Sequence, residues 1–141
     1  MTLQTEIAEA VAPVIADLIT ELGEQGQLRR RDESDADDGS RRSTLNRVPG
    51  ASEPIGLLPT NRSASRMAQD WGRDREVALE AFVLDTEPLQ EGDVVRLLTG
   101  AFTGRWVEAW KSRREPAGGV NIWAFLDAGD AARLDQLDVG F

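Results

Sequence analysis

Four short apolar runs, separated by turn-forming residues, constrain the fold more than any other feature of the chain. Each run is rich in Val, Leu, Ile, Phe or Trp and is bounded by Gly, Pro, Asp or Thr, as β-strands usually are. The connectors contain glycine or proline and are too short for the helical crossover that parallel strands require. The sequence therefore predicts an antiparallel meander of four strands, at residues 77–84, 94–98, 105–110 and 120–126.

Alternation along the last run assigns its side chains to two faces of the sheet. One face carries aliphatic residues, and the other carries Asn121, Trp123 and Phe125. We predict that the aliphatic face is the core of a mainly β fold, a small antiparallel barrel or a sandwich-like meander. The aromatic pair then needs a separate cover, which is a helix, a neighbouring strand or another subunit. The predicted core residues, which must share a face, are Val94, Leu98, Val107, Val120, Ile122 and Leu126.

Three of the four tryptophans, Trp106, Trp110 and Trp123, lie in this block. Aromatic rings are a common means of burying area in a small sheet, which favours core positions for them. They are also frequent anchors of protein interfaces. Both interpretations stay open, and Trp106 and Trp110 are candidate interface residues.

The same block carries an ordered set of turn and strand motifs. A polar-Gly-Asp turn opens one strand, an aromatic-Val pair marks the next, and a Gly-Gly turn leads into a closing strand with an aromatic residue near its end. The residues are Gly92-Asp93, Trp106-Val107, Gly118-Gly119 and Trp123. In this respect the C-terminal half of the chain resembles the head-tail joining proteins of tailed phages, also called head-closure or stopper proteins.

The resemblance implies a virion structural protein that is made in the host cytoplasm and located in the phage neck. Such a protein forms a homo-oligomeric ring, with six-fold symmetry favoured and twelve-fold symmetry as the alternative. Portal or adaptor proteins lie on one side of the ring, and tail-terminator or tail proteins lie on the other. The ring closes the head, retains DNA and docks the tail, and DNA passes through it without specific binding. A tail-terminator ring protein is an alternative in the same setting.

Composition sets further bounds. At 141 residues we expect one domain, with a helix at 2–23, short strands and long polar loops at 27–75, the barrel core at 76–128 and a tail at 129–141. Sixteen basic and twenty-five acidic residues give a net charge of −9, which argues against gripping nucleic-acid phosphates as the main task. The absence of Cys and His removes disulfides, thiolate and imidazole catalysis and most zinc chemistry, and we expect no cofactor. No apolar stretch approaches the ~18 to 20 residues of a membrane span, so we expect a soluble cytoplasmic product with no membrane partner.

Residues 2–23 have a helical period, with acidic residues lying away from the apolar ones. Thr2 is a suitable N-cap and Gly23 a suitable C-terminal end, whereas Pro13 is expected to kink or split the helix. We predict an amphipathic helix that lies over the barrel or docks on a neighbouring subunit. Its apolar stripe consists of Leu3, Ile7, Ala10, Val11, Val14, Leu18 and Leu22.

The chain changes character from Gly26 to about Glu53, where charges come in blocks and the apolar period is lost. We predict a long polar loop that becomes ordered on assembly, preceded at most by a short strand at residues 27–31. The acidic block fails the spacing of an EF-hand, because Leu45 stands where a bidentate Glu is needed. The block is a candidate channel lining or partner loop, with plain solubility as the alternative; its residues are Asp32, Glu33, Asp35, Asp37 and Asp38.

Two further segments carry weaker signals. Residues 54–60 are fenced by prolines and predict at most an edge strand, and the spacing of Met67 and Trp71 fits one helical turn or a pinned loop. Near the C-terminus, residues 131–137 predict one or two helical turns. This end is either frayed or a tail that packs into a partner, with candidate interface residues Leu134, Leu137 and Phe141.

A nucleic-acid-binding barrel is the alternative from a different functional class. Its aromatic side chains would stack on bases, and Arg105, Lys111, Arg113 and Arg114 would contact phosphate. Catalysis has little support, because paired carboxylates or a Ser-Lys arrangement would have to replace His and Cys. Glu108 is a candidate acid, but a solvent-facing strand position explains it equally well. We predict no catalytic, cofactor-binding or metal-binding residue.

Overall fold

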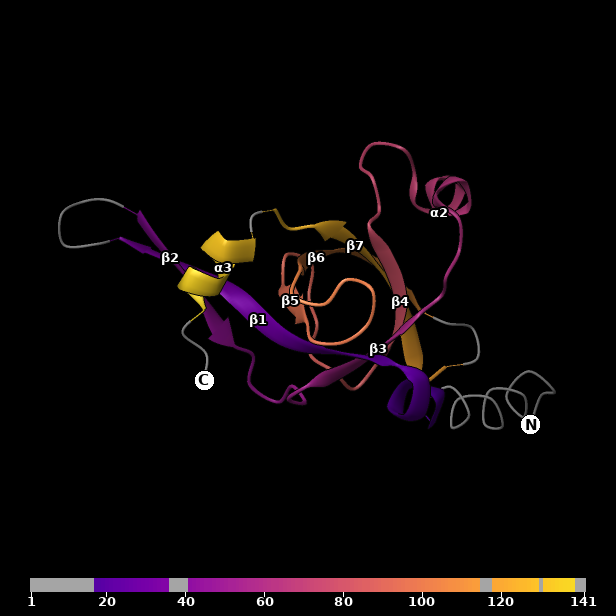
Figure 1. The fold of residues 1–141 in the computed structure, drawn as a ribbon, viewed down its shortest axis with the longest axis horizontal. Coiled ribbons are helices and arrows are strands. Elements are labelled where there is room, and N and C mark those ends of the chain that lie inside the picture. The colour runs from indigo at the N-terminus through magenta and orange to yellow at the C-terminus, as the bar shows by residue number, and fades with distance from the viewer. Residues whose placement is uncertain (1–16, 36–40, 115–117, 130, 139–141) are drawn as a thin grey trace.

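Seven antiparallel strands and short helices make up the computed structural model, which describes residues 17–35, 41–114, 118–129 and 131–138 (Figure 1). Residues 17–22 are helical and precede the first strand. Helix α2 spans Ala64–Trp71 and helix α3 spans Ala131–Leu137. The strands are β1 Glu24–Asp35, β2 Arg41–Arg47, β3 Ile55–Pro59, β4 Leu79–Leu84, β5 Val94–Leu97, β6 Trp106–Arg114 and β7 Val120–Asp127.

Six of the strands close into a barrel, which confirms the predicted mainly β, antiparallel barrel class. The order around the barrel is β1, β3, β4, β7, β6 and β5, and β5 pairs with β1 to complete the circle. The four strands expected in residues 76–128 are β4 to β7. The expected four-strand meander is wrong at one connection, because β4 pairs with β3 and β7 instead of β5. The long connector after β4 carries the chain to the other side of the barrel before β5 begins.

The predicted alternation along β7 holds, but the predicted choice of the inner face is wrong. Trp123 and Phe125 belong to the central core, whereas Ala124 and Ile122 belong to a separate cluster on the outside of the barrel. The predicted core set therefore does not share one face. When both faces of a strand are apolar, alternation separates them without telling which one is interior. The larger aromatic rings fill the barrel, and the aliphatic face is the one that needs a cover.

Strand β3 corrects the expectation of an edge strand at residues 54–60. It pairs with β1 on one side, where Glu24 stands opposite Leu57, and with β4 on the other, where Leu58 stands opposite Phe82. Proline does not prevent this arrangement. Pro54 lies before the strand and Pro59 is its last residue, so the ladder between them keeps its donors.

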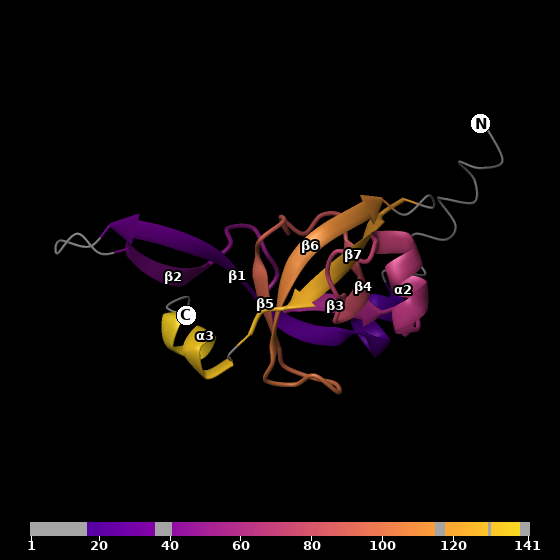
Figure 2. The same cartoon turned by 90° about the horizontal axis from the view of Figure 1, so that it is seen from above.

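The largest correction concerns residues 26–53, where the sequence predicted a long polar loop. Half of this segment is a two-stranded hairpin, which we call the arm. It consists of the second half of β1 paired with β2, from Arg29 opposite Arg47 to Asp35 opposite Arg41. The arm projects beyond the barrel in both views (Figures 1 and 2). It forms despite its polarity because β1 is continuous from the barrel wall into the arm, so the barrel already sets the register for β2.

Helices α2 and α3 lie against two different parts of the outside of the barrel. Ser63 is the N-cap of helix α2, and its hydroxyl accepts a hydrogen bond from the Arg66 amide. The helix places Met67 and Trp71 on the cluster that contains Ala124. The expected pair of contacts at Met67 and Trp71 is therefore present, on a helix longer than one turn. Helix α3 lies beside the base of the arm (Figure 2).

Candidate partner-binding surfaces

The arm and α3 form one unit around a small apolar cluster. Leu45 of β2, Val94 of β5, Trp106 of β6 and Leu134 of α3 are all buried together there. Leu137 is half-buried at its edge. Two predicted interface residues, Trp106 and Leu134, are therefore used inside the chain. They pack the arm and α3 against β5 and β6.

Arg29 connects three segments at the end of the arm nearest the barrel. Its side chain is buried, and its guanidinium donates from Nε to Asp138 at 2.8 Å and from Nη1 to Glu53 at 2.6 Å and to the Leu28 carbonyl at 2.9 Å. Burial opposes the charge of Arg29, but the hydrogen bonds to Glu53 and Asp138 outweigh it and raise its pKa. The arm, the segment after β2 and the end of α3 are thus joined by one cation.

Arg30, on the opposite face of β1, joins the arm to the turn that precedes β5. Its Nε and Nη2 atoms lie 2.9 and 3.0 Å from the two oxygens of Asp93, which also accepts from the Gln90 amide at 2.9 Å. The hydrogen bonds to Asp93 raise the pKa of Arg30 against the opposing effect of burial. Asp93 is buried, so the Gly-Asp turn singled out in the sequence is a structural anchor.

Three of the five acidic residues predicted to line a channel, Asp32, Glu33 and Asp35, lie in the outer part of the arm. Asp32 is exposed on β1, Glu33 and Asp35 continue the same strand, and Asp37 and Asp38 fall outside the described residues. In the hairpin register, Asp35 stands opposite Arg41 and Glu33 opposite Ser43. The first part of the acidic run is therefore strand, and its backbone pairs with β2.

The remaining predicted interface residues are divided. Trp110 is the extra residue of a bulge in β6 and packs half-buried at the edge of the cluster under α2, where the Lys111 ammonium lies 4.5 Å from its ring centre. Phe141 falls outside the described residues. Trp110 thus remains a partly accessible aromatic residue, as an interface anchor requires.

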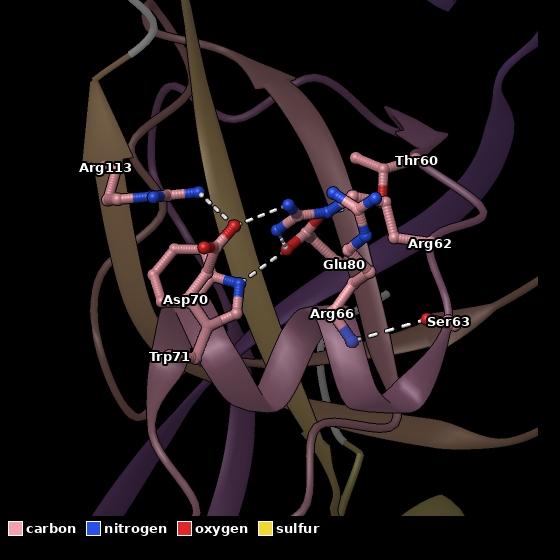
Figure 3. A network of polar contacts seen from close by, with 8 residues as sticks. All are labelled: Thr60, Arg62, Ser63, Arg66, Asp70, Trp71, Glu80 and Arg113. Atoms are coloured by element: carbon pink, nitrogen blue, oxygen red, sulfur yellow. Dashed lines mark hydrogen bonds and ion pairs between the residues drawn. The ribbon is translucent and has the colours of Figure 1, made fainter.

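A polar network that the sequence did not single out attaches α2 to the barrel (Figure 3). At its centre is Glu80 of β4, whose side chain is only 1% exposed. Its carboxylate accepts from Thr60 at 2.6 Å, from Arg62 at 2.7 and 2.5 Å, and from the Trp71 indole at 2.5 Å. Arg62 also pairs with Asp70 of α2. The only signal in the sequence was one acidic residue within an otherwise apolar strand.

The electrostatics of Glu80 indicate a structural role. Burial acts against its charge, but the hydrogen bonds from Arg62, Thr60 and Trp71 prevail and lower its pKa to about 2. The same contacts raise the pKa of Arg62. A general acid needs a raised pKa and a free face toward substrate. Glu80 has neither, because its two oxygens are occupied by four donors.

The cations proposed to contact nucleic-acid phosphate mostly have partners within the chain. Arg105 pairs with Asp127 at 2.8 Å, and Arg113 stacks 4.7 Å from the ring centre of Trp71 and lies 3.6 Å from Asp70. Glu108, the candidate acid, pairs with Arg31 at 3.2 Å. Arg105, Arg113 and Glu108 thus each lie close to an oppositely charged group within the chain.

Three findings complete the description of the surface. Within the described ranges, no group of three or more acidic side chains is arranged to hold a metal ion. No helix in this part of the chain is long and apolar enough to cross a membrane. No family model, curated protein or solved structure matches the chain.

Proposed function

We propose that the chain is a structural subunit of a phage neck, which assembles as a ring between portal or adaptor proteins and the tail. The proposal rests on the resemblance of its strand and turn motifs, and the fold supports it. Gly92-Asp93 opens β5, Trp106-Val107 opens β6 and Gly118-Gly119 precedes β7, in the positions that the resemblance implies.

The observation that carries the proposal is the arm. A closed barrel has no free strand edge through which copies can join. The arm reaches beyond the barrel, and its outer part is held mainly by the pairing of β1 with β2. An extended hairpin with little support from its own domain is typical of a segment that contacts a neighbouring subunit, and its charged side chains suit pairing between subunits.

In the assembled ring, the acidic end of β1 would lie near the path of DNA. Acidic side chains repel phosphate, so DNA would pass without adhering to the lumen. Closing the head and docking the tail would be steric tasks that use the arm and the barrel end.

A shortened arm tests this function. Arg31 and Leu45 stand directly opposite each other, so residues 32–44 can be replaced by Asn-Gly, a two-residue turn suited to a hairpin. Mass photometry and negative-stain imaging should show rings for the intact chain and no rings for the shortened chain. Circular dichroism should show that the shortened barrel still folds.

Two results would contradict the proposal. One is ring formation by the chain with the shortened arm, because residues 32–44 would then be unnecessary for assembly. The other is a lack of rings for the intact chain together with tight, salt-sensitive binding of single-stranded DNA in a gel shift, which would favour the nucleic-acid-binding barrel.

A further inference from the structure

The helical residues 17–22 expose two leucines. Leu18 is 37% exposed and Leu22 is 70% exposed, and these are the large apolar side chains that the described part of the chain leaves in solvent. They are four residues apart and therefore lie on one face of the helix. Ile19, by contrast, is buried.

Ile19 fixes the orientation of this helix on the barrel. Its side chain lies over Gly56 of β3, where an added Cβ would stand 2.6 Å from its Cγ2 atom. At Gly23 an added Cβ would stand 2.3 Å from the Ile19 carbonyl and 2.9 Å from the Leu57 carbonyl. The two glycines permit a close approach that locks Ile19 inward. Leu18 and Leu22 cannot turn toward the barrel without removing Ile19 from it.

The two exposed leucines end a longer apolar pattern in the sequence. Apolar residues recur at steps of three and four from Leu3 through Ile7, Val11 and Val14 to Leu18 and Leu22. Acidic residues flank this pattern, among them Asp17 and Glu21, which are exposed. The pattern thus describes an apolar stripe with acidic borders, and its described end has no cover on its own barrel.

An apolar groove of about 390 Å³ lies along α2 and the segment that follows it. Its apolar lining comes from Ala64, Met67, Ala68 and Val77, and its rim carries Arg73 and Arg75 against a single acidic residue, Glu76. The groove therefore has the apolar character and the surplus positive charge that complement the helix.

We infer that the helical residues 17–22 of one copy bind, through Leu18 and Leu22, in the α2 groove of the next copy. The helical residues 17–22 and α2 lie on opposite sides of the same end of the barrel (Figure 1). A contact between two different surfaces of identical chains is head-to-tail, and such contacts close into rings when the rotation permits. The inference deepens the proposed ring function and rests on it only in requiring that copies assemble.

Cysteine cross-linking tests this contact directly, because the chain contains no cysteine. Chains with Leu22→Cys are mixed with chains with Met67→Cys and oxidised. We expect disulfide-linked dimers in the mixture and few in either variant alone. The matched control mixes Leu22→Cys with Gln136→Cys, an exposed position on α3 near the arm, and should remain monomeric.

A double variant with both cysteines distinguishes docking between copies from docking within one chain. A cross-link within single chains, with none between copies, would overturn the inference. So would equal cross-linking to Met67→Cys and to the control position. Replacing Arg73 and Arg75 by Glu should weaken self-association, and replacing Asp17 and Glu21 by Lys in the same chain should restore it.

The test separates this inference from the ring function. Rings observed by mass photometry without the Leu22 to Met67 cross-link would overturn the helix contact and leave the ring standing. Cross-linked chains that grow into open filaments or stay as pairs would support the contact and contradict the ring.

Discussion

Helices α2 and α3 cover two outer faces of the barrel, and each is attached by a hydrogen bond from a tryptophan indole to a carboxylate. The helix supplies the donor on one side and the acceptor on the other. On the α2 side, Trp71 of the helix donates its indole N–H to Glu80 of the barrel. On the α3 side, Trp106 of the barrel donates its indole N–H to Asp135 of the helix, at 2.8 Å. The two tryptophans are buried, but the acceptors differ: the Glu80 side chain is 1% exposed and the Asp135 side chain is 43% exposed.

The difference shows how burial sets the contribution of a polar contact. A buried carboxylate cannot return to water, so its donors become indispensable, whereas an exposed carboxylate exchanges its donor for solvent at little cost. We therefore expect α2 to depend on its polar network and α3 to depend on its apolar cluster.

Removing the buried carboxylate should have the largest effect. Glu80→Ala leaves Arg62, Thr60 and Trp71 without their acceptor, and breaking a buried ion pair in this way costs about 3 to 5 kcal/mol of unfolding free energy. Denaturant titration measures the loss. Glu80→Gln is the matched control, since it keeps the size and some acceptor capacity and should lose less. A loss below about 1 kcal/mol for Glu80→Ala would contradict the structural role of the network.

Lowering the pH should destabilise the chain through the same residue, because it protonates the Glu80 carboxylate. The pKa of Glu80 is about 2 in the folded chain against an ordinary 4.5, a difference equivalent to about 3 kcal/mol. Because the pKa is lowered by folding, this stabilisation is fully present above pH about 4.5 and is lost as the pH falls toward about 2. The stability advantage of the wild type over Glu80→Gln should shrink across this interval, while contributions from other carboxylates cancel between the two proteins. If the difference in unfolding free energy between the two proteins stayed constant across this interval, ionisation of Glu80 would not stabilise the fold.

A matched pair of substitutions compares the two indole hydrogen bonds. Trp71→Phe and Trp106→Phe both keep an aromatic ring and both remove the N–H donor. We expect Trp71→Phe to lose about 1.5 to 3 kcal/mol through the hydrogen bond to a buried charged acceptor, and Trp106→Phe to lose about 1 kcal/mol through its bond. Thermal or denaturant unfolding of the two variants measures the difference. Equal losses of unfolding free energy in the two variants would mean that burial of the acceptor does not change the contribution of the indole hydrogen bond.

The sequence predicted four of the six barrel strands, β4 to β7, because local rules govern them. Gly92, Gly104 and Gly119 mark turns at strand starts, and the apolar runs between turns are long enough for strands. It did not predict the inner face of β7, since Trp123 and Ile122 are both apolar and only the closure of the barrel decides between them. It also missed the pairing of β4 with β7, which depends on a contact between distant segments.

The sequence did not predict the arm or the polar network either, because both depend on contacts between segments that are distant in the chain. The strand residues of the arm are mostly polar, and their pairing is set by a strand that begins inside the barrel at Glu24. Glu80 has a structural role only because Arg62 and Trp71 donate hydrogen bonds to it, and these donors reach it once α2 has packed over β4. The sequence marks Trp106 as a candidate interface residue because it shows no partner for this side chain, yet α3 supplies one within the chain.

The smallest expected effect concerns the exposed acceptor. Asp135→Asn keeps an oxygen that accepts from the Trp106 indole and removes the charge that pairs with Arg96 at 3.3 Å. Pairs of this exposure contribute about 0 to 1 kcal/mol, so the unfolding free energy should change by less than about 1 kcal/mol. The same chemical change at Glu80, from carboxylate to amide, should cost clearly more, and the two variants measured side by side in one denaturant series isolate the effect of burial. If Asp135→Asn proved as destabilising as Glu80→Gln, α3 would depend on its charge rather than on Leu134 and the cluster beneath it.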